Sequence, residues 1–273
     1  MPHSTRRNKN SSRAKRIETT TSDGWTVVAH TNPSASVRNR SERETPTGVR
    51  SILPDLTLGR LKSDYDRARA QWQDGECHTR LTGILSKMTR DVEHAVCLGV
   101  GSFSVDTQNR WRSLWQLVAF TSIVSALSKG STSIKIWAQD PCFTSLDTEF
   151  LESLGVTVVQ HPQAKQHITE KTFLYAPFVD WSITLDFALD ETDPSLYIGT
   201  DIKQIMDTLE RISKAHEYDC YTSEEKAVDT DHYIAIAERF CKGRDVCAFP
   251  KYEGQAYWQD GLKIYWKEEA EED

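Results

Sequence analysis

A predicted strand that runs directly into two glycines is the segment of this sequence best suited to chemistry. Residues 96–104 are Val-Cys-Leu-Gly-Val-Gly-Ser-Phe-Ser. Gly99 and Gly101 permit a tight turn and close backbone approach, and free N–H groups at such a turn can hold a phosphate or another anion. Gly99, Gly101, Ser102 and Ser104 are therefore candidate residues for binding a small anionic or nucleotide-like ligand.

Two more polar residues follow other predicted strands. Asp140 comes after a strand at residues 134–138, and Thr200 comes after one at residues 196–198. In an open parallel sheet, the carboxyl ends of the strands line the usual ligand crevice. A carboxylate there can accept hydrogen bonds from ribose hydroxyls. Together with the glycine turn, Asp140 and Thr200 suggest a pocket for a nucleotide or S-adenosylmethionine.

The dinucleotide-binding pattern is incomplete, however. Ser104 stands at the third glycine of G-x-G-x-x-G, and Asp140 lies 41 positions after Gly99, whereas the pattern expects about 20. Glycines at a strand end also commonly form an ordinary turn. A purely structural role for this segment stays open beside the ligand-binding one.

No other group of side chains has a catalytic pattern. Cys97 lies in a predicted buried strand and should be inert, while Cys142 lies near the crevice without an evident His–Asp partner. The motifs G-x-S-x-G, P-loop and H-E-x-x-H are absent, and the histidines lack metal-ligand spacing. The sequence thus assigns no catalytic residue, metal or cofactor. The histidines considered are His94, His161 and His167, and Trp115, Trp137 and Trp181 are interpreted as core residues.

The elements that position these residues alternate as in an α/β protein. The pattern predicts a Rossmann-like three-layer fold with a mostly parallel sheet. A polar loop at residues 216–231 and an aromatic tail at 257–266 complete the domain. Strands are predicted at residues 94–99, 134–138, 156–159, 172–175, 196–198 and 246–249, and helices at 58–72, 77–89, 111–127, 144–154, 180–189, from 202 onward and at 233–240.

Charge and hydropathy divide the chain near residue 50. Residues 1–50 hold ten Lys or Arg and four Asp or Glu, a charge of +6. Because the whole chain has a formal net charge of −7, residues 51–273 carry −13. We expect a disordered basic arm at 1–50, a single domain at 51–266 and an acidic tail at 267–273. An acidic domain argues against a broad nucleic-acid surface, so nucleic acid could bind only through the arm. A solvated tail is the simpler interpretation of that arm.

Further features of the sequence indicate where the protein acts. No stretch of about 18 apolar residues or signal-peptide pattern occurs. The six cysteines form no C-x-x-C pair and do not resemble a disulfide framework. These features predict a protein of the cytoplasm or nucleus without a membrane span.

Six short segments in order resemble the SRR-like (Sensitivity to Red Light Reduced) domain family, over about residues 92–202. The resemblance implies a Rossmann-like domain in cytoplasm or nucleus, with relatives in light signalling and circadian rhythm and no securely assigned reaction. A short motif at Asp23–Val28 is also similar to one these proteins carry. The segments are Cys97–Ser102, Gln116–Leu117, Gln139–Pro141, Leu154–Gly155, Tyr175–Pro177 and Tyr197–Gly199.

The chain departs from the family pattern at two strand ends. Pro177-Phe178-Val179 stands where the family has Pro-His-Cys, and Gly199-Thr200 where it has Gly-Asn. These differences remove polar groups from the crevice. We therefore expect a regulatory or interaction protein with an unidentified protein partner. The alternative is a Rossmann-like enzyme that uses an adenosine-containing cofactor, in the manner of a methyltransferase.

Overall fold

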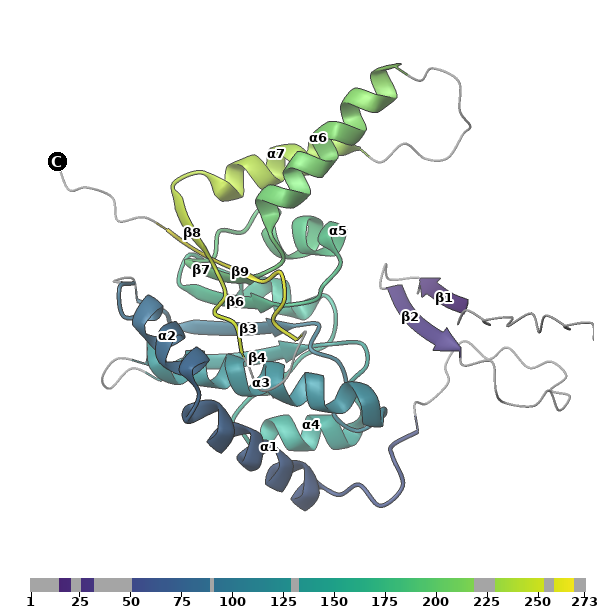
Figure 1. Ribbon diagram of the computed structural model, residues 1–273, viewed down its shortest axis with the longest axis vertical. Coiled ribbons are helices and arrows are strands. Elements are labelled where there is room, and N and C mark those ends of the chain that lie inside the picture. Colours follow the sequence, from purple (N-terminus) through teal and green to yellow (C-terminus); the bar gives the residue numbers. More distant parts are fainter. Residues whose placement is uncertain are drawn as a thin grey trace, which may run out of the picture. The chain divides into compact units, whose positions relative to one another are not determined.

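The computed structural model describes residues 15–20, 26–31, 51–88, 91–128, 133–218, 229–252 and 258–267. The chain forms two units, residues 1–49 and 50–273. In the first unit, β1 (Lys15–Thr20) pairs antiparallel with β2 (Thr26–Thr31) (Figure 1).

This hairpin lies within the arm that the sequence predicts to be disordered. β2 includes Thr26–Val28, part of the short motif, and β1 contains β-branched residues, which favour strands. The rest of the arm, with Trp25 and the basic residues before β1, lies outside the described residues.

A seven-stranded sheet in the order β5-β4-β3-β6-β7-β9-β8 forms the centre of the second unit. The first five strands in this order are parallel, which confirms the predicted α/β fold, and β9 lies antiparallel between β7 and β8. The strands are β3 (His94–Leu98), β4 (Lys135–Gln139), β5 (Thr157–Val158), β6 (Thr172–Ala176), β7 (Leu196–Gly199), β8 (Arg244–Ala248) and β9 (Lys263–Lys267).

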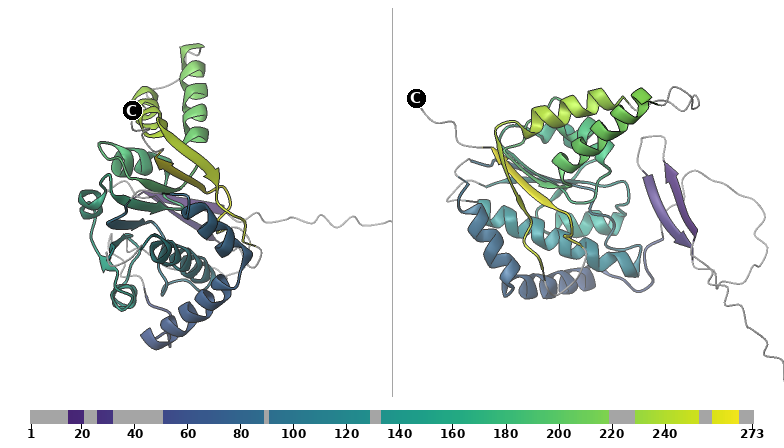
Figure 2. Two further views of the ribbon diagram at one scale, coloured as in Figure 1. Left: turned by 90° about the vertical axis from the view of Figure 1, so that its left-hand side faces the viewer. Right: turned by 45° about the horizontal axis from the view of Figure 1, so that its top comes forward.

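Helices cover both faces of the sheet, as Figures 1 and 2 show. The chain moves from β3 outward to β5 on one side and from β6 to β7 on the other, so the connecting helices fall on opposite faces. One face carries α1 (Leu58–Gln73), α2 (Glu76–Leu85), α3 (Thr107–Leu127) and α4 (Ser145–Glu152). The other carries α5 (Trp181–Ile183), the π-helix η2 (Thr184–Leu189), α6 (Ile202–Tyr218) and α7 (Thr230–Cys241), while η1 (Gln163–His167) connects β5 to β6.

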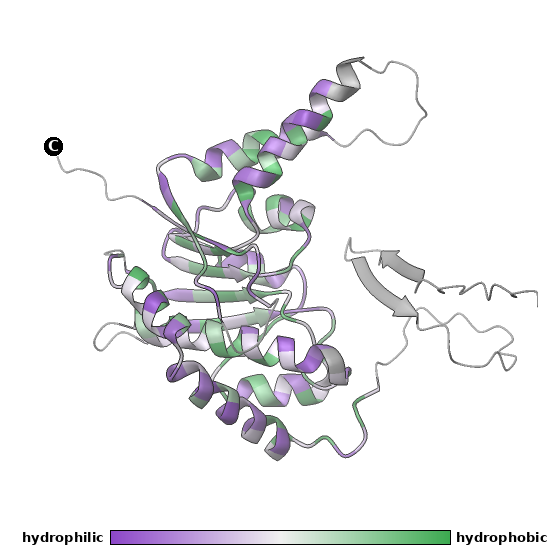
Figure 3. Ribbon diagram, viewed as in Figure 1, coloured by the Kyte–Doolittle hydropathy of each residue, from purple (hydrophilic) through white to green (hydrophobic). Residues whose placement is uncertain are grey.

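Apolar side chains alternate along the strands and supply a core on each face. Ala95 and Cys97 join the core beneath α1–α3, and the intervening Val96 is buried on the other side. Phe120 of α3 stacks on Phe173 of β6 with ring centroids 5.6 Å apart. Burial of one such side chain contributes about 1.5–3 kcal/mol. Figure 3 shows hydrophilic residues on the exposed side of α1 and hydrophobic ones along the strands.

Most predicted elements occur, and several bounds differ. Asp180 caps its helix by accepting the Ser182 N–H at 2.9 Å, but the α-helix lasts three residues before the π-helix follows. α6 extends to Tyr218, into the predicted loop at 216–231. The aromatic tail at 257–266 is strand β9 from Lys263 onward. Cys220, Tyr257, most of that loop and residues 268–273 of the acidic tail lie outside the described residues.

None of the helices in the described ranges is long and apolar enough to cross a membrane.

Candidate functional site

Five of the six predicted ligand-binding residues lie together at the carboxyl edge of the sheet. β3 and β4 are neighbours, and the Gly99 N–H donates to the Gln139 carbonyl at 3.2 Å, which brings the glycine turn beside Asp140. Thr200 follows β7, and β6 lies between β7 and β3. Because adjacent strands are about 4.8 Å apart, Thr200 is roughly 10 Å from the turn.

The Asp140 carboxylate binds the backbone of the glycine turn. Its Oδ2 accepts the Gly101 N–H at 2.7 Å, and its Oδ1 accepts the Cys142 N–H at 2.7 Å. The turn itself depends on glycine, because Gly99 and Gly101 have φ values of 69° and 77°. The N–H group that could hold an external anion therefore already holds the protein's own carboxylate.

A second carboxylate, Asp147, fixes the remainder of the turn. It is fully buried and accepts the Ser102 hydroxyl at 2.6 Å, the Phe103 N–H at 3.0 Å and the Thr144 N–H at 2.8 Å. The Ser104 and Thr144 hydroxyl oxygens are 2.8 Å apart. Three donors compensate for the burial of this charge.

Asp147 was not among the predicted site residues, although a sequence signal for it exists. Thr144 and Asp147 form a capping box at the start of α4, and the spacing Ser/Thr-x-x-acid is typical of that arrangement. What the spacing does not indicate is that the same carboxylate reaches across to the glycine turn after β3.

An apolar side chain closes the crevice where the chain reverses its direction across the sheet. The strand order turns between β3 and β6, which is where ligands usually bind in such sheets. A Cβ on Gly99 would lie 2.5 Å from Cγ2 of Val179. Val179 is itself buried, so its side chain covers the backbone that a ligand would need to approach.

The Gly199–Thr200 turn is held by aromatic residues. A Cβ at Gly199 would lie 2.2 Å from the Tyr197 hydroxyl, which explains the glycine two positions after this tyrosine. The Tyr197 hydroxyl donates to the Thr200 carbonyl at 3.5 Å, and the Tyr265 hydroxyl of β9 donates to Asp201 at 2.9 Å. Burial raises the pKa of both phenols, so neither ionises near neutral pH.

Thiols in the site region have the character of core groups. Cys97 is buried within β3, and burial raises the pKa of its thiol well above the usual value. Burial also raises the pKa of Cys77 to about 12. The predicted burial of Cys97 is therefore confirmed, and its lack of reactivity stays a prediction. Cys142 is partly exposed.

The histidines and tryptophans are brought together in a way that their sequence spacing does not indicate. His167 stacks on the Trp137 ring at 4.0 Å, and His94 meets the same ring edge-on at 5.1 Å. Trp115 is buried as predicted, whereas Trp137 and Trp181 are only partly buried. In the ranges the structure covers, no three His, Cys, Asp or Glu side chains group as metal ligands.

Comparison with known proteins identifies a family. No curated protein matches the chain. The family model of the SRR1 domain matches residues 68–264, which extends beyond the 92–202 range of the sequence resemblance on both sides and includes β8. Since this match covers more than half of the sequence and agrees with the α/β fold, the chain belongs to the SRR1 domain family.

Proposed function

We propose that this SRR1-domain protein is a regulatory or interaction protein that acts by binding a protein partner in the cytoplasm or nucleus. The observation that supports it most is the state of the carboxyl edge. The polar groups of the glycine turn are bonded to Asp140 and Asp147, and Val179 covers Gly99.

The rim of the same edge presents a pair of residues suited to protein contacts. The Phe178 side chain is 37% exposed, and the Arg112 guanidinium lies 4.0 Å from the centre of its ring. Burial lowers the pKa of Arg112, and because an arginine side chain is not deprotonated in proteins, the group is cationic. Aromatic and arginine side chains dominate the binding energy of many protein interfaces.

Capture of partners by the full chain tests this proposal. Among the described residues, Phe178 and Ile212 are the exposed large hydrophobic side chains, at 37% and 40%. We expect Phe178→Ser to lose a captured protein that the wild type and the Ile212→Ser control both retain. Equal capture by all three chains would reject the rim as the partner surface.

Within this proposal, a small anion can act as a regulator at the glycine turn. Asp140 already places a carboxylate oxygen 2.7 Å from the Gly101 nitrogen, so an anionic ligand would compete with that carboxylate for the same N–H. Gly99, Gly101, Ser102, Ser104 and Asp140 form this candidate site, with Thr200 at its far side. Binding of a ligand would release Asp140 and alter the connection after β4.

A second candidate function is a Rossmann-like enzyme that uses an adenosine-containing cofactor such as S-adenosylmethionine, in the manner of a methyltransferase. The strand order reverses between β3 and β6, the usual ligand-binding position of a dinucleotide-binding sheet, although the antiparallel β9 lies between β7 and β8. Fold analogy alone does not supply a function. Both oxygens of Asp140, the expected ribose ligand, accept backbone N–H bonds, so we rank this candidate second.

Thermal unfolding of the full chain separates the two candidates. We expect no shift with S-adenosylmethionine or nicotinamide cofactors, whereas a ligand at about 100 times its Kd would add about 2.7 kcal/mol. A shift with S-adenosylmethionine that disappears in Asp140→Ala would make the enzyme the better candidate. A shift with phosphate that instead grows in Asp140→Ala would support the anion regulator.

A further inference from the structure

The opposite, amino edge of the sheet contains a pocket that the sequence motifs do not indicate. Its volume is about 520 Å³, within the usual range for small-molecule sites. It lies where β8 begins and where antiparallel β9 ends. The residues on which the argument depends are Glu191, Asp193, Arg239, Phe240, Lys242 and Lys267.

Positive charge exceeds negative charge around this pocket. Asp193 accepts from both Arg244 and Lys267, so one carboxylate serves two cations. The Arg244 side chain is 1% exposed and lies 4.3 Å from the Phe240 ring centre. The Arg244 guanidinium is buried behind the residues that line the pocket. Because solvent and salt screen a buried charge only weakly, its positive charge acts on the pocket.

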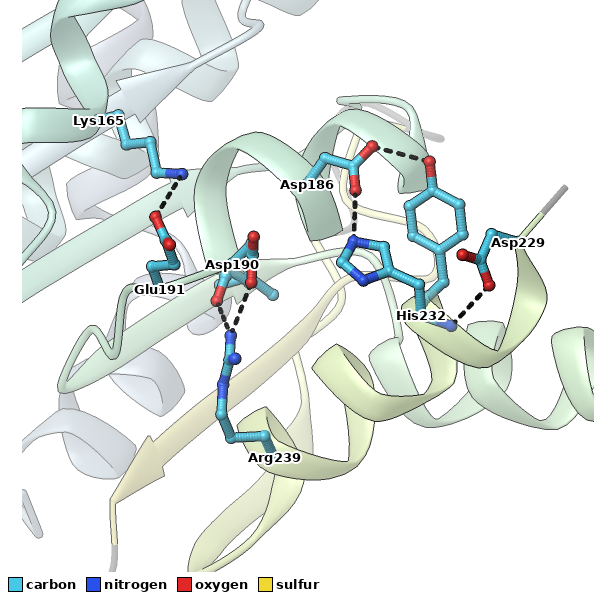
Figure 4. Close-up of polar contacts among 9 residues, drawn as sticks. Lys165, Asp186, Asp190, Glu191, Asp229, His232 and Arg239 are labelled. Atoms are coloured by element: carbon cyan, nitrogen blue, oxygen red, sulfur yellow. Dashed lines mark hydrogen bonds and ion pairs between the residues drawn. The ribbon is translucent and has the colours of Figure 1, made fainter.

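Figure 4 shows two ion pairs of the outer wall, between Arg239 and Asp190 and between Lys165 and Glu191. Arg239 donates to the Leu189 carbonyl at 2.8 Å and to Asp190 at 3.5 Å, while Glu191 lies 3.8 Å from Lys165. Lys242 is exposed and has no ion pair with any residue that the structure describes. The charged lining residues are the cations Arg239, Lys242 and Lys267 and the acids Glu191 and Asp193, an excess of one positive charge. Their ion-pair partners outside the lining, Lys165, Asp190 and Arg244, bring the excess to two.

The backbone beside the pocket is unusual and held in place. η2 is a π-helix that ends at Leu189, and π-helical turns are frequent at functional sites. Glu191 follows with a φ of 60°, a conformation uncommon outside glycine. Arg239 holds the end of η2 through the Leu189 carbonyl. The wall is therefore preorganised, which lowers the entropic cost of binding.

We propose that this pocket binds a small multivalent anion, either a phosphate ester or a polycarboxylate. An excess of two positive charges, on a chain whose formal net charge is −7, matches a compact dianion and disfavours a cation. Lys242 supplies a cation without an ion-pair partner at the mouth, and lysine binds phosphate and carboxylate as a point charge. This site is independent of the glycine turn, which lies at the other edge.

Isothermal titration of the full chain with pyrophosphate, and separately with citrate, tests the proposal. We expect binding of at least one probe, weakened by added NaCl because the contacts are ionic. Lys242→Glu should weaken binding roughly tenfold, since it replaces an attractive charge with a repulsive one. The matched control is Lys251→Glu, the same charge change at an exposed lysine beside the end of β8 on the carboxyl edge.

The two probes distinguish the source of the anion. Preference for pyrophosphate would assign the pocket to phosphate esters, and preference for citrate to polycarboxylates. Absence of binding by both probes at millimolar concentration would overturn the proposal. Equal loss in Lys242→Glu and Lys251→Glu would overturn it too, because a general charge effect would then explain the result. Unchanged thermal unfolding of both variants confirms that each has folded.

Discussion

The two edges of the sheet use charge in opposite ways. At the carboxyl edge, Asp140 and the fully buried Asp147 are bonded to the backbone and hydroxyl donors of the glycine turn. At the amino edge, the cations outnumber the acids, and the lining acids Glu191 and Asp193 have side-chain exposures of 80% and 50%. The edge with the familiar motif is thus stabilised from within, whereas the edge without a motif has charge left over for a ligand.

The comparison shows that a glycine turn is informative only together with what faces it. Backbone N–H groups attract an anion wherever it comes from, and the nearest carboxylate can belong to the same chain. Asp140 is close because β4 lies beside β3. A motif at a strand end therefore defines an anion-binding geometry but not the identity of the anion.

The largest expected effect distinguishes the two edges through their glycines. Gly99→Ala places a Cβ 2.5 Å from Val179 at a φ of 69°, and should lower the free energy of unfolding by about 3 kcal/mol or more. Gly243→Ala at the amino edge has a similar φ of 64° but no atom within 4 Å of the new Cβ, and should cost about 1 kcal/mol. Urea unfolding measures both. Equal costs would mean that Val179 does not close the crevice tightly.

Replacement of one acid at each edge should give the next largest difference. Asp147→Asn introduces an NH₂ group among three donors in a fully buried site, and we expect a loss of about 2–3 kcal/mol. Glu191→Gln, at an exposed carboxylate, should change stability by less than about 0.5 kcal/mol. The same urea experiment applies. A small effect at Asp147 would contradict its role in holding the turn.

Local patterns in the sequence account for much of this architecture. Apolar runs and helical spacing predicted where strands β3 to β8 lie along the chain. A buried strand requires a short apolar run, and an amphipathic helix requires apolar residues at helical spacing. The proximity of Gly99 and Asp140 followed from the rule that parallel strands end at one edge. The helices predicted at residues 144–154 and 180–189 do begin there, and Thr144 and Asp180 cap them.

Contacts between distant segments could not be predicted in this way. The reach of Asp147 to Ser102 spans 45 positions, and the position of Val179 over Gly99 depends on how β6 lies beside β3. β9 was predicted only as an aromatic tail, since its buried Ile264 and Tyr265 need both neighbouring strands to form a sheet. The amino-edge pocket depends on β9, because its reversed direction carries Lys267 there.

The smallest expected effect concerns pH and again lies away from the glycine turn. His167 stacks on Trp137 near His94, at the start of β3. Burial, and then the nearby His94, lower the pKa of His167 below the ordinary value of 6.5. The unfolded chain therefore binds a proton more readily than the folded one in this range. This contribution to stability is present above about pH 6.5 and is lost as the pH falls through the pKa of the folded state.

The loss should be about 0.5 kcal/mol or less, because the ring is only partly buried. Urea unfolding between pH 5 and 8 measures it, and His167→Phe is the control, since it keeps an aromatic ring on Trp137 and removes the titrating group. We expect the slope of stability against pH to decrease in this variant. An unchanged slope of stability against pH in His167→Phe would mean that other groups cause the pH dependence. If the slope were instead lost only in carboxyl-edge variants such as Asp147→Asn, the titrating group would lie at the carboxyl edge and not at the amino edge.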